Sequence, residues 1–266
     1  MANDQRLHYL RRGSGEPLLL IQGLSGNHLH WGERFLTLLE PAFETIAYDH
    51  RGIGLSGPSP PGYTIADLAD DADALLDATG LQSAHVMGVS MGGMVAQELA
   101  LRAPQRVRSL TLGCTYAGGA GSVRTDPAVV QRLGQLFMAG RMGEAMRELI
   151  RYNVSERFAS DPANLEQFKR IAAQLPASLD VLLAQFQAVG GHDTSERLGD
   201  ITAPTLVVHG SDDRILPVAN AQAIAARIPG VRLEILDGVG HLFWWERPER
   251  SAQLVGELAR SAPARQ

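Results

Sequence analysis

Short runs of β-branched residues and leucine alternate with longer amphipathic runs over most of this chain. A short apolar run between turn residues predicts a buried strand, whereas apolar positions that repeat every three to four residues predict a helix. This alternation is typical of βα units, so we expect an α/β fold with a mostly parallel central sheet flanked by helices. The predicted strands cover residues 18–21, 45–48, 84–88, 107–112, 205–209 and 231–236. The predicted helices between and after them cover residues 64–78, 91–102, 218–227 and 249–260.

The strand pattern stops between residues 117 and 197. Helical periodicity continues there in four runs, and glycines at 118–121 and 190–191 flank the stretch. We therefore predict an α/β core of residues 1–116 and 198–266, with residues 117–197 forming a helical cap inserted over one edge of the sheet. Helices that merely extend the fold are the alternative. The four helical runs cover residues 128–138, 142–152, 165–175 and 179–189.

A G-x-S-x-G pentapeptide, with Ser90 at its centre, lies between the predicted strand 84–88 and the predicted helix 91–102. This is the position of a nucleophile elbow, where a strand turns sharply into a helix and exposes a serine hydroxyl. Gly88 and Gly92 suit such a turn, because a Cβ atom on either side of a strained serine would clash. With 28 glycines in 266 residues the pentapeptide alone is only suggestive, so its context decides.

The composition of the chain argues against two classes of partner, nucleic acids and membranes. The net charge of −5 provides no basic surface for a phosphate backbone, so we expect no nucleic-acid partner. No apolar run approaches the ~20 residues of a membrane span, and the first twelve residues are polar, so we expect a cytoplasmic chain with no membrane partner. The single cysteine, Cys114, excludes an internal disulfide and lies in an apolar stretch, where a buried structural thiol is expected. Nothing in the sequence indicates the oligomeric state.

A serine nucleophile needs a base within hydrogen-bond distance and a third group that orients the base. Downstream of Ser90, the predicted strand 205–209 runs into an acidic turn with Asp212 and Asp213, and His241 follows the predicted strand 231–236. The order Ser, Asp, His is one of the known chain orders of a catalytic triad. Strand-to-helix loops of a parallel sheet emerge at one edge, so these three loops should converge despite their separation in sequence.

These residues resemble those of the α/β-hydrolase fold family over essentially the full length of the chain. The resemblance implies a serine hydrolase with Ser90 as nucleophile, His241 as base and Asp213, three residues after Gly210, as the acid in preference to Asp212. It also implies an oxyanion hole formed by the backbone N–H groups of Leu24 and Met91. The matching segments are residues 22–24, 49–56, 88–92, 210–213 and 240–241. Many members of the family carry histidine where this chain has Gln22, which leaves the main-chain donors unaffected.

Other polar residues have structural interpretations. We expect Asp49 to brace the glycine-containing loop 49–56 through a contact with Arg51. His28 and His30 lack a further ligand cluster, so we expect no metal and no cofactor. His28 is close in sequence to Leu24 and is a candidate for the mouth of the substrate pocket.

The segment 117–197 is rich in methionine, leucine and phenylalanine, and its charges balance, which favours an apolar substrate. We predict a serine hydrolase that cleaves carboxylic esters or lactones of small apolar molecules through an acyl-enzyme. The predicted pocket residues are His28, Phe137, Met138, Met142 and Leu242.

Three alternative functions stay open. Cofactor-free haloperoxidases or perhydrolases share the same features. Carbon–carbon bond hydrolases of this fold usually carry tryptophan directly after the catalytic histidine, where this chain has Leu242. Plant hormone receptors of this fold use an intact triad mainly to bind a ligand. Dehalogenases and epoxide hydrolases carry a carboxylate nucleophile in place of serine, which disfavours them here.

Overall fold

The computed structural model describes residues 3–263 and, within them, all side chains except those of Phe137, Met142 and Met146. Seven strands form one sheet in the order β1-β3-β2-β4-β5-β6-β7. All neighbouring pairs are parallel except β1 with β3, so the mostly parallel sheet is confirmed. The strands are β1 (Tyr9–Arg12), β2 (Glu16–Ile21), β3 (Phe43–Tyr48), β4 (Ala84–Val89), β5 (Val107–Gly113), β6 (Thr205–Gly210) and β7 (Arg232–Leu236).

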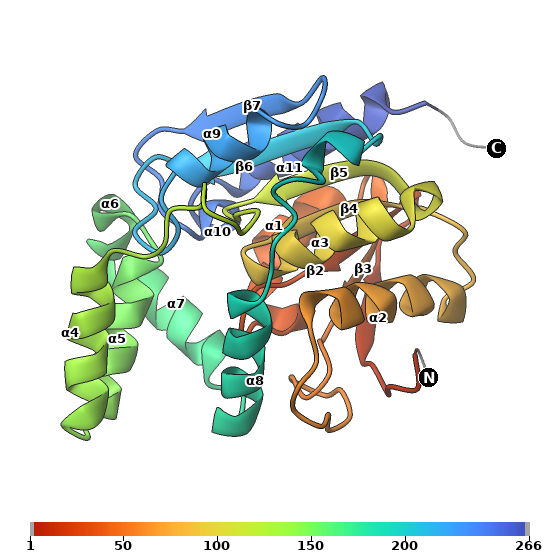
Figure 1. Cartoon of the computed structure of the whole chain (residues 1–266). Helices are drawn as coiled ribbons and strands as arrows, with labels where there is room; N and C mark the ends of the chain where they lie inside the picture. The colour runs from red at the N-terminus through yellow and green to blue at the C-terminus, as the bar shows by residue number, and fades with distance from the viewer. Residues whose placement is uncertain (1–2, 264–266) are drawn as a thin grey trace.

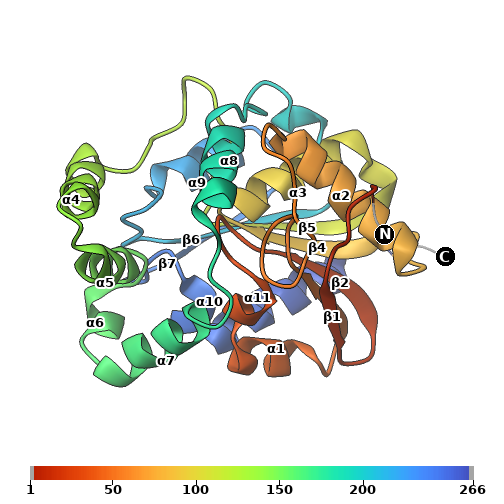
Figure 2. The same cartoon turned by 90° about the horizontal axis from the view of Figure 1, so that it is seen from below.

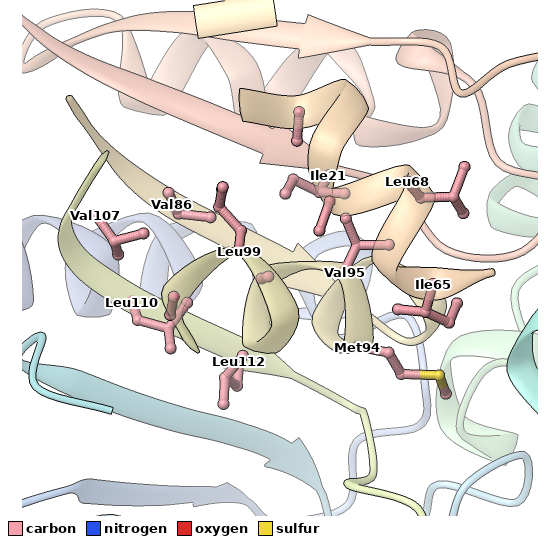
Figure 3. Close-up of a cluster of buried hydrophobic side chains, with 14 of the residues drawn as sticks. Ile21, Ile65, Leu68, Val86, Met94, Val95, Leu99, Val107, Leu110 and Leu112 are labelled. Carbon is pink, nitrogen blue, oxygen red and sulfur yellow. The ribbon is translucent and has the colours of Figure 1, made fainter. Parts of the chain in front are cut away.

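Helices cover both faces of the sheet. On one face lie α2 (Ile65–Ala78), α3 (Met91–Arg102) and α9 (Ala219–Ala225), and on the other lie α1 (Glu33–Leu39) and α11 (Pro248–Ser261) (Figures 1 and 2). Each face has its own buried apolar cluster. Figure 3 shows the first of them, in which Leu68 of α2 and Val95 of α3 lie with Ile21 and Val86 of the sheet.

Helix α2 begins as its sequence predicts. Thr64 is its N-cap, accepts a hydrogen bond from the backbone N–H of Asp67 at 3.2 Å, and donates its own backbone N–H to the Asp67 carboxylate. This reciprocal capping box satisfies two backbone donors that the helix leaves without partners. Gly80, at φ 76°, follows the end of the helix in a backbone conformation that favours glycine.

Five helices lie between β5 and β6 in the chain, and we call them the helical segment. They gather at one side of the sheet, where α4 and α5 stand apart as a pair (Figures 1 and 2). The sequence predicts four of them, and the short α6 was missed. Their bounds are α4 (Pro127–Met138), α5 (Met142–Tyr152), α6 (Glu156–Ala159), α7 (Pro162–Ala172) and α8 (Leu179–Gly190). The division into core and cap at residues 116 and 198 stays a prediction.

Short elements complete the fold. Three are single 3₁₀ turns, and α10 directly follows the loop that carries His241. These elements are η1 (His28–Trp31), η2 (Pro104–Arg106), η3 (Leu198–Asp200) and α10 (Phe243–Glu246). Within residues 3–263, no helix combines the length and apolar character needed to span a bilayer.

Candidate active site

Ser90 occupies the sharp turn between β4 and α3. Its backbone lies at φ 54° and ψ −121°, a strained conformation for a residue with a side chain. The flanking glycines are required by close contacts. A Cβ on Gly88 would lie 2.1 Å from the carbonyl oxygen of Gly92, and a Cβ on Gly92 would lie 2.1 Å from that of Ile21. The turn therefore has the geometry of a nucleophile elbow.

Asp213 and His241 form a buried pair at the same edge of the sheet. Nδ1 of His241 lies 2.6 Å from Oδ2 of Asp213. The other oxygen of Asp213 accepts the backbone N–H groups of Ile215 and Leu216, each at 2.9 Å. Burial raises the pKa of the Asp213 carboxyl, but the charge and hydrogen bonds of His241 and His209 outweigh it and hold the pKa well below its usual range. The carboxylate is thus ionised and oriented.

Asp212, the neighbouring acid, takes no part in this pair. It is exposed, and its Oδ1 accepts a hydrogen bond from the hydroxyl of Ser211 at 3.0 Å. The structure therefore brings Asp213 to His241, the choice that the family resemblance implies.

The loops after β4, β5 and β6 lie side by side. Ser90 donates its backbone N–H to Gly113, and Cys114 donates to Val208, both at 2.9 Å. A Cβ on Gly113 would lie 2.7 Å from the ring of Phe243, two residues after His241. The sheet thus carries the hydroxyl and the imidazole to one edge. Among the described residues, Ser90 Oγ has no hydrogen-bond partner in this conformation.

The loop after β2 lies against the serine. A Cβ on Gly23 would be 3.0 Å from Ser90 Cβ and 3.6 Å from Ser90 Oγ. Within residues 3–263, the backbone N–H groups of Leu24 and Met91 form no hydrogen bond, so one free donor lies in the loop after β2 and one at the elbow. Their role as an oxyanion hole stays a prediction.

Gln185 of α8 fixes this loop, a role that was not predicted from the sequence. Its Oε1 accepts the backbone N–H of Ser25 at 2.7 Å, and Ser25 has a positive φ of 62°. Gln185 is fully buried. Its signal in the sequence is a polar residue at a position of α8 that shares a helix face with the buried Ala184 and Ala188.

The structure places the predicted pocket residues in different surroundings. Leu242 is buried beside His241, and its backbone N–H donates to Asn153 in the helical segment at 2.9 Å. Met138 ends α4 with 91% of its surface exposed, so its place in the pocket stays a prediction. The side chains of Phe137 and Met142 lie outside the described residues.

His28 forms a second buried pair, with Asp49. Its Nδ1 and backbone N–H lie 2.9 and 2.7 Å from Oδ1 of Asp49. Oδ2 of Asp49 accepts the backbone N–H of Leu55 at 2.9 Å. Burial raises the pKa of Asp49, but these hydrogen bonds lower it overall. His28 is therefore held against the loop 49–56.

The expected contact between Asp49 and Arg51 is not formed. Arg51 instead forms a bidentate ion pair with Asp71 of α2, at 2.7 and 2.6 Å. The expectation was wrong because the Asp49 carboxylate turns inward to backbone and imidazole donors, which leaves the guanidinium to a carboxylate from another element.

A potential metal-ligand set also involves His28. His8, His28 and Asp49 place ligand atoms within 4.8 Å of one another, a combination that the sequence analysis did not find. In this arrangement both oxygens of Asp49 already accept N–H groups, so hydrogen bonding accounts for the cluster. His30 lies outside it, because its Nδ1 accepts the backbone N–H of Asn27 at 3.1 Å.

Comparison with known proteins agrees with this geometry. Residues 16–248 match the family model described as the alpha/beta hydrolase fold. The chain belongs to this family. It is 32% identical to a putative carbamate hydrolase, RutD, of Azorhizobium caulinodans over 241 residues, which cover 90% of this chain and 89% of that protein.

Two solved structures are similar over nearly the whole chain. One is Est816, an N-acyl homoserine lactone degrading enzyme, with 31% identity, a TM-score of 0.79, and coverage of 95% of this chain and 96% of that chain. The other is a thermophilic esterase of Thermogutta terrifontis, with 28% identity, a TM-score of 0.79, and coverage of 96% and 93%. This chain of the α/β-hydrolase family is therefore a hydrolase.

Proposed function

We propose that this hydrolase cleaves carboxylic esters or lactones of small apolar molecules through an acyl-enzyme at Ser90. The observation that carries the proposal is the 2.6 Å contact between His241 Nδ1 and Asp213, at the sheet edge where Ser90 occupies its strained turn. An alcohol is a weak nucleophile at neutral pH, and an oriented imidazole removes that limitation.

In the first half-reaction, Ser90 Oγ attacks the carbonyl carbon while Nε2 of His241 takes its proton. The leaving alkoxide then receives that proton from the imidazolium. Asp213 stays ionised throughout, holds the proton of His241 on Nδ1 and stabilises the imidazolium. Water attacks the acyl-enzyme in the second half-reaction, with His241 again as base.

The tetrahedral intermediate carries an oxyanion that needs donors already in place. The unpaired N–H groups of Leu24 and Met91 suit this role, because they need not break other hydrogen bonds when the charge develops. One such donor contributes about 3 kcal/mol when measured by its removal. Gln185 supports the role by fixing Ser25, the residue after Leu24.

Apolar side chains on α8 support an apolar substrate. Leu179, Leu183 and Phe186 are each more than half exposed at helical spacing, on the helix that also carries Gln185 to the loop beside Ser90. A substrate with an apolar acyl or alcohol group would remove this surface from water. Further lining remains proposed for His28, Phe137, Met138, Met142 and Leu242.

Carbamates are a second candidate substrate class, because a relative with 32% identity over 90% of this chain is named as a putative carbamate hydrolase. The same groups would act on a carbamate. Ser90 would form a carbamoyl-enzyme, and the two N–H donors would bind the same developing oxyanion.

The test is a substrate panel on wild type and Ser90→Ala. It includes p-nitrophenyl acetate and butyrate, N-acyl homoserine lactones of graded chain length, and an aryl carbamate. We expect turnover of at least one ester or lactone by wild type, with kcat lower by a factor of ~10³ or more in Ser90→Ala. Ser160→Ala, which alters an exposed serine of the helical segment, serves as the control and should match wild type.

The alternatives give different results in the same assays. Halogenation that depends on peroxide and acetate would indicate a perhydrolase, and cleavage of a carbon–carbon bond in a dienoic acid would indicate a carbon–carbon bond hydrolase. Stabilisation by a ligand with no turnover would indicate a receptor. Equal ester turnover by wild type and Ser90→Ala would overturn the proposal.

A further inference from the structure

A second histidine contacts the carboxylate of Asp213. His209 lies on β6, four residues before Asp213, and is completely buried. Its Nε2 lies 2.7 Å from the carbonyl oxygen of Leu216 and 3.0 Å from Oδ2 of Asp213. Because both neighbours of Nε2 are acceptors, this nitrogen must carry a hydrogen.

The two imidazoles converge on one oxygen. His241 Nδ1 and His209 Nε2 both face Oδ2 of Asp213, at 2.6 and 3.0 Å, while Oδ1 accepts two backbone N–H groups. Three hydrogen bonds, together with the nearby N–H of His209 that also donates to Leu216, therefore fix the plane of the carboxylate. Of the two side-chain donors, His241 is the proposed base, and His209 has no place in the proposed proton transfers.

Packing alone does not explain a histidine at this position. Among the described residues, Nδ1 of His209 is buried without a hydrogen-bond partner. An unpaired buried polar atom costs stability, and an apolar side chain would fill the end of β6 without that cost. The cost of the unpaired Nδ1 is offset by Nε2, whose N–H donates to the Leu216 carbonyl and lies against the buried carboxylate of Asp213.

We propose that His209 is a positioning residue of the acyl-enzyme mechanism, one that orients Asp213 and takes up part of its negative charge. The inference rests on the proposed function of Ser90, Asp213 and His241. A carboxylate that shares its charge with a second donor attracts an imidazolium less strongly. The proposal therefore predicts that loss of the His209 donor strengthens the hold of Asp213 on the protonated form of His241.

The other ionisable groups around Asp213 are engaged elsewhere or uncharged. Cys114, at the end of β5, is buried, and its burial together with the charge of Asp213 raises the pKa of its thiol. Asp212 is exposed and accepts from Ser211. Arg214 lies over the ring of Tyr152, 4.4 Å from its centre, and pairs with Glu156. His209 and His241 are therefore the side chains that face the carboxylate.

The experiment compares His209→Leu with His209→Gln. Leucine removes the donor, whereas the glutamine amide can place an N–H near the position of Nε2. The readout is the pH profile of kcat/KM for p-nitrophenyl butyrate. We expect the acid limb in His209→Leu to move to higher pH by roughly half a unit or more, with kcat lower by about tenfold, and in His209→Gln to return towards wild type.

A matched control uses another buried imidazole. His85 lies near the start of β4, at the opposite end of the sheet from Ser90, and its Nδ1 contacts the hydroxyl of Ser109 at 2.8 Å. His85→Gln should leave the acid limb unchanged. If folded His209→Leu gives a profile that superimposes on that of wild type, the proposal is wrong. His209→Met is used if the leucine variant does not fold.

A second readout does not depend on activity. The Nδ1 proton of His241, in its short hydrogen bond to Asp213, should give a far-downfield proton NMR signal. Its titration midpoint should rise in His209→Leu and not in His85→Gln. An unchanged midpoint refutes the role of His209 even if no ester is turned over. A shifted midpoint with no turnover by wild type would instead reject the proposed function and keep the coupling.

Discussion

The carboxylate of Glu246 ties Ser155 of the helical segment to the loop that carries His241. Its Oε1 accepts the backbone N–H of Ser155 and that of Gly240, each at 2.9 Å, and its Oε2 accepts the hydroxyl of Ser155. Gly240 directly precedes His241, and Ser155 is the N-cap of α6. A Cβ on Gly240 would lie 2.6 Å from the backbone of Val154, so the two segments are in close contact.

This contact predicts different results for two substitutions of Glu246. Glu246→Gln keeps an oxygen for both N–H groups and can donate to the Ser155 hydroxyl, so unfolding by urea should change by less than ~1 kcal/mol. Glu246→Leu leaves two buried N–H groups unpaired, so we expect a loss of about 2–4 kcal/mol and at least a tenfold loss of kcat/KM. Wild-type kcat/KM in the leucine variant would show that the loop needs no such anchor.

The elbow glycines predict a sharp contrast between two alanine substitutions. In Gly92→Ala the new Cβ would lie 2.1 Å from the carbonyl oxygen of Ile21. Because a backbone atom of the sheet can move only at a high cost in energy, we expect the free energy of unfolding to fall by more than ~3 kcal/mol. Gly134→Ala is the control, since this exposed glycine of α4 has open space around its Cβ position and should gain about 0.5–1 kcal/mol. Urea unfolding of both variants checks the pair, and equal midpoints would contradict the tight turn.

The hydrogen bond between Gln185 and Ser25 predicts that its removal changes kcat with little change in stability. Gln185→Leu removes the acceptor for Ser25 N–H but also removes an amide nitrogen that, within the described residues, has no partner, so the two costs partly cancel. The loop carrying Leu24 then loses its anchor, and we expect kcat to fall about tenfold while KM changes little, because the oxyanion forms only during the reaction. Gln187→Leu, on the exposed side of the same helix, should leave both constants unchanged.

The parallel sheet, the turn at Ser90 and the pairing of Asp213 with His241 were predictable from the sequence because their signals are local. Ser90 lies in a pentapeptide whose glycines are required within two residues, and Asp213 follows the apolar run of β6. The strand before His241, β7, is mostly exposed, and its signal is the alternation of polar and apolar residues. The antiparallel edge strand β1 was missed, since Tyr9–Arg12 is short and half polar. The helix α10 was also missed, because four residues are too few for a helical period to be recognised.

The polar contacts that organise the site could not be predicted. Gln185 binds Ser25 across 160 residues of sequence, and Glu246 binds Ser155 across 91. Hydrogen bonds between distant elements depend on how the helices pack against the sheet, and they produce no periodic pattern in the sequence. The mistaken pairing of Asp49 with Arg51 has the same origin, because proximity in sequence was the only guide to a partner.

One partly buried histidine and one buried histidine make stability depend on pH. Burial lowers the pKa of His30 to about 4, and it lowers that of His192 to about 4 as well. Both imidazoles are therefore neutral in the folded protein at pH 6, and Nδ1 of His30 accepts the backbone N–H of Asn27 in that form. In the unfolded chain each would have the ordinary pKa of about 6.5.

We therefore expect the protein to lose stability between pH 6.5 and about 4. In that interval the unfolded chain binds protons that the folded protein does not, so stability is fully present above pH 6.5 and falls by up to ~1.4 kcal/mol per pH unit for each imidazole. His30→Asn keeps an acceptor for the Asn27 N–H through its Oδ1 but cannot titrate. Urea unfolding of this variant should give a shallower fall below pH 6.5 and nearly wild-type stability at pH 8, where both imidazoles are neutral in either state. An identical slope in wild type and His30→Asn would mean that His30 is protonated in the folded protein.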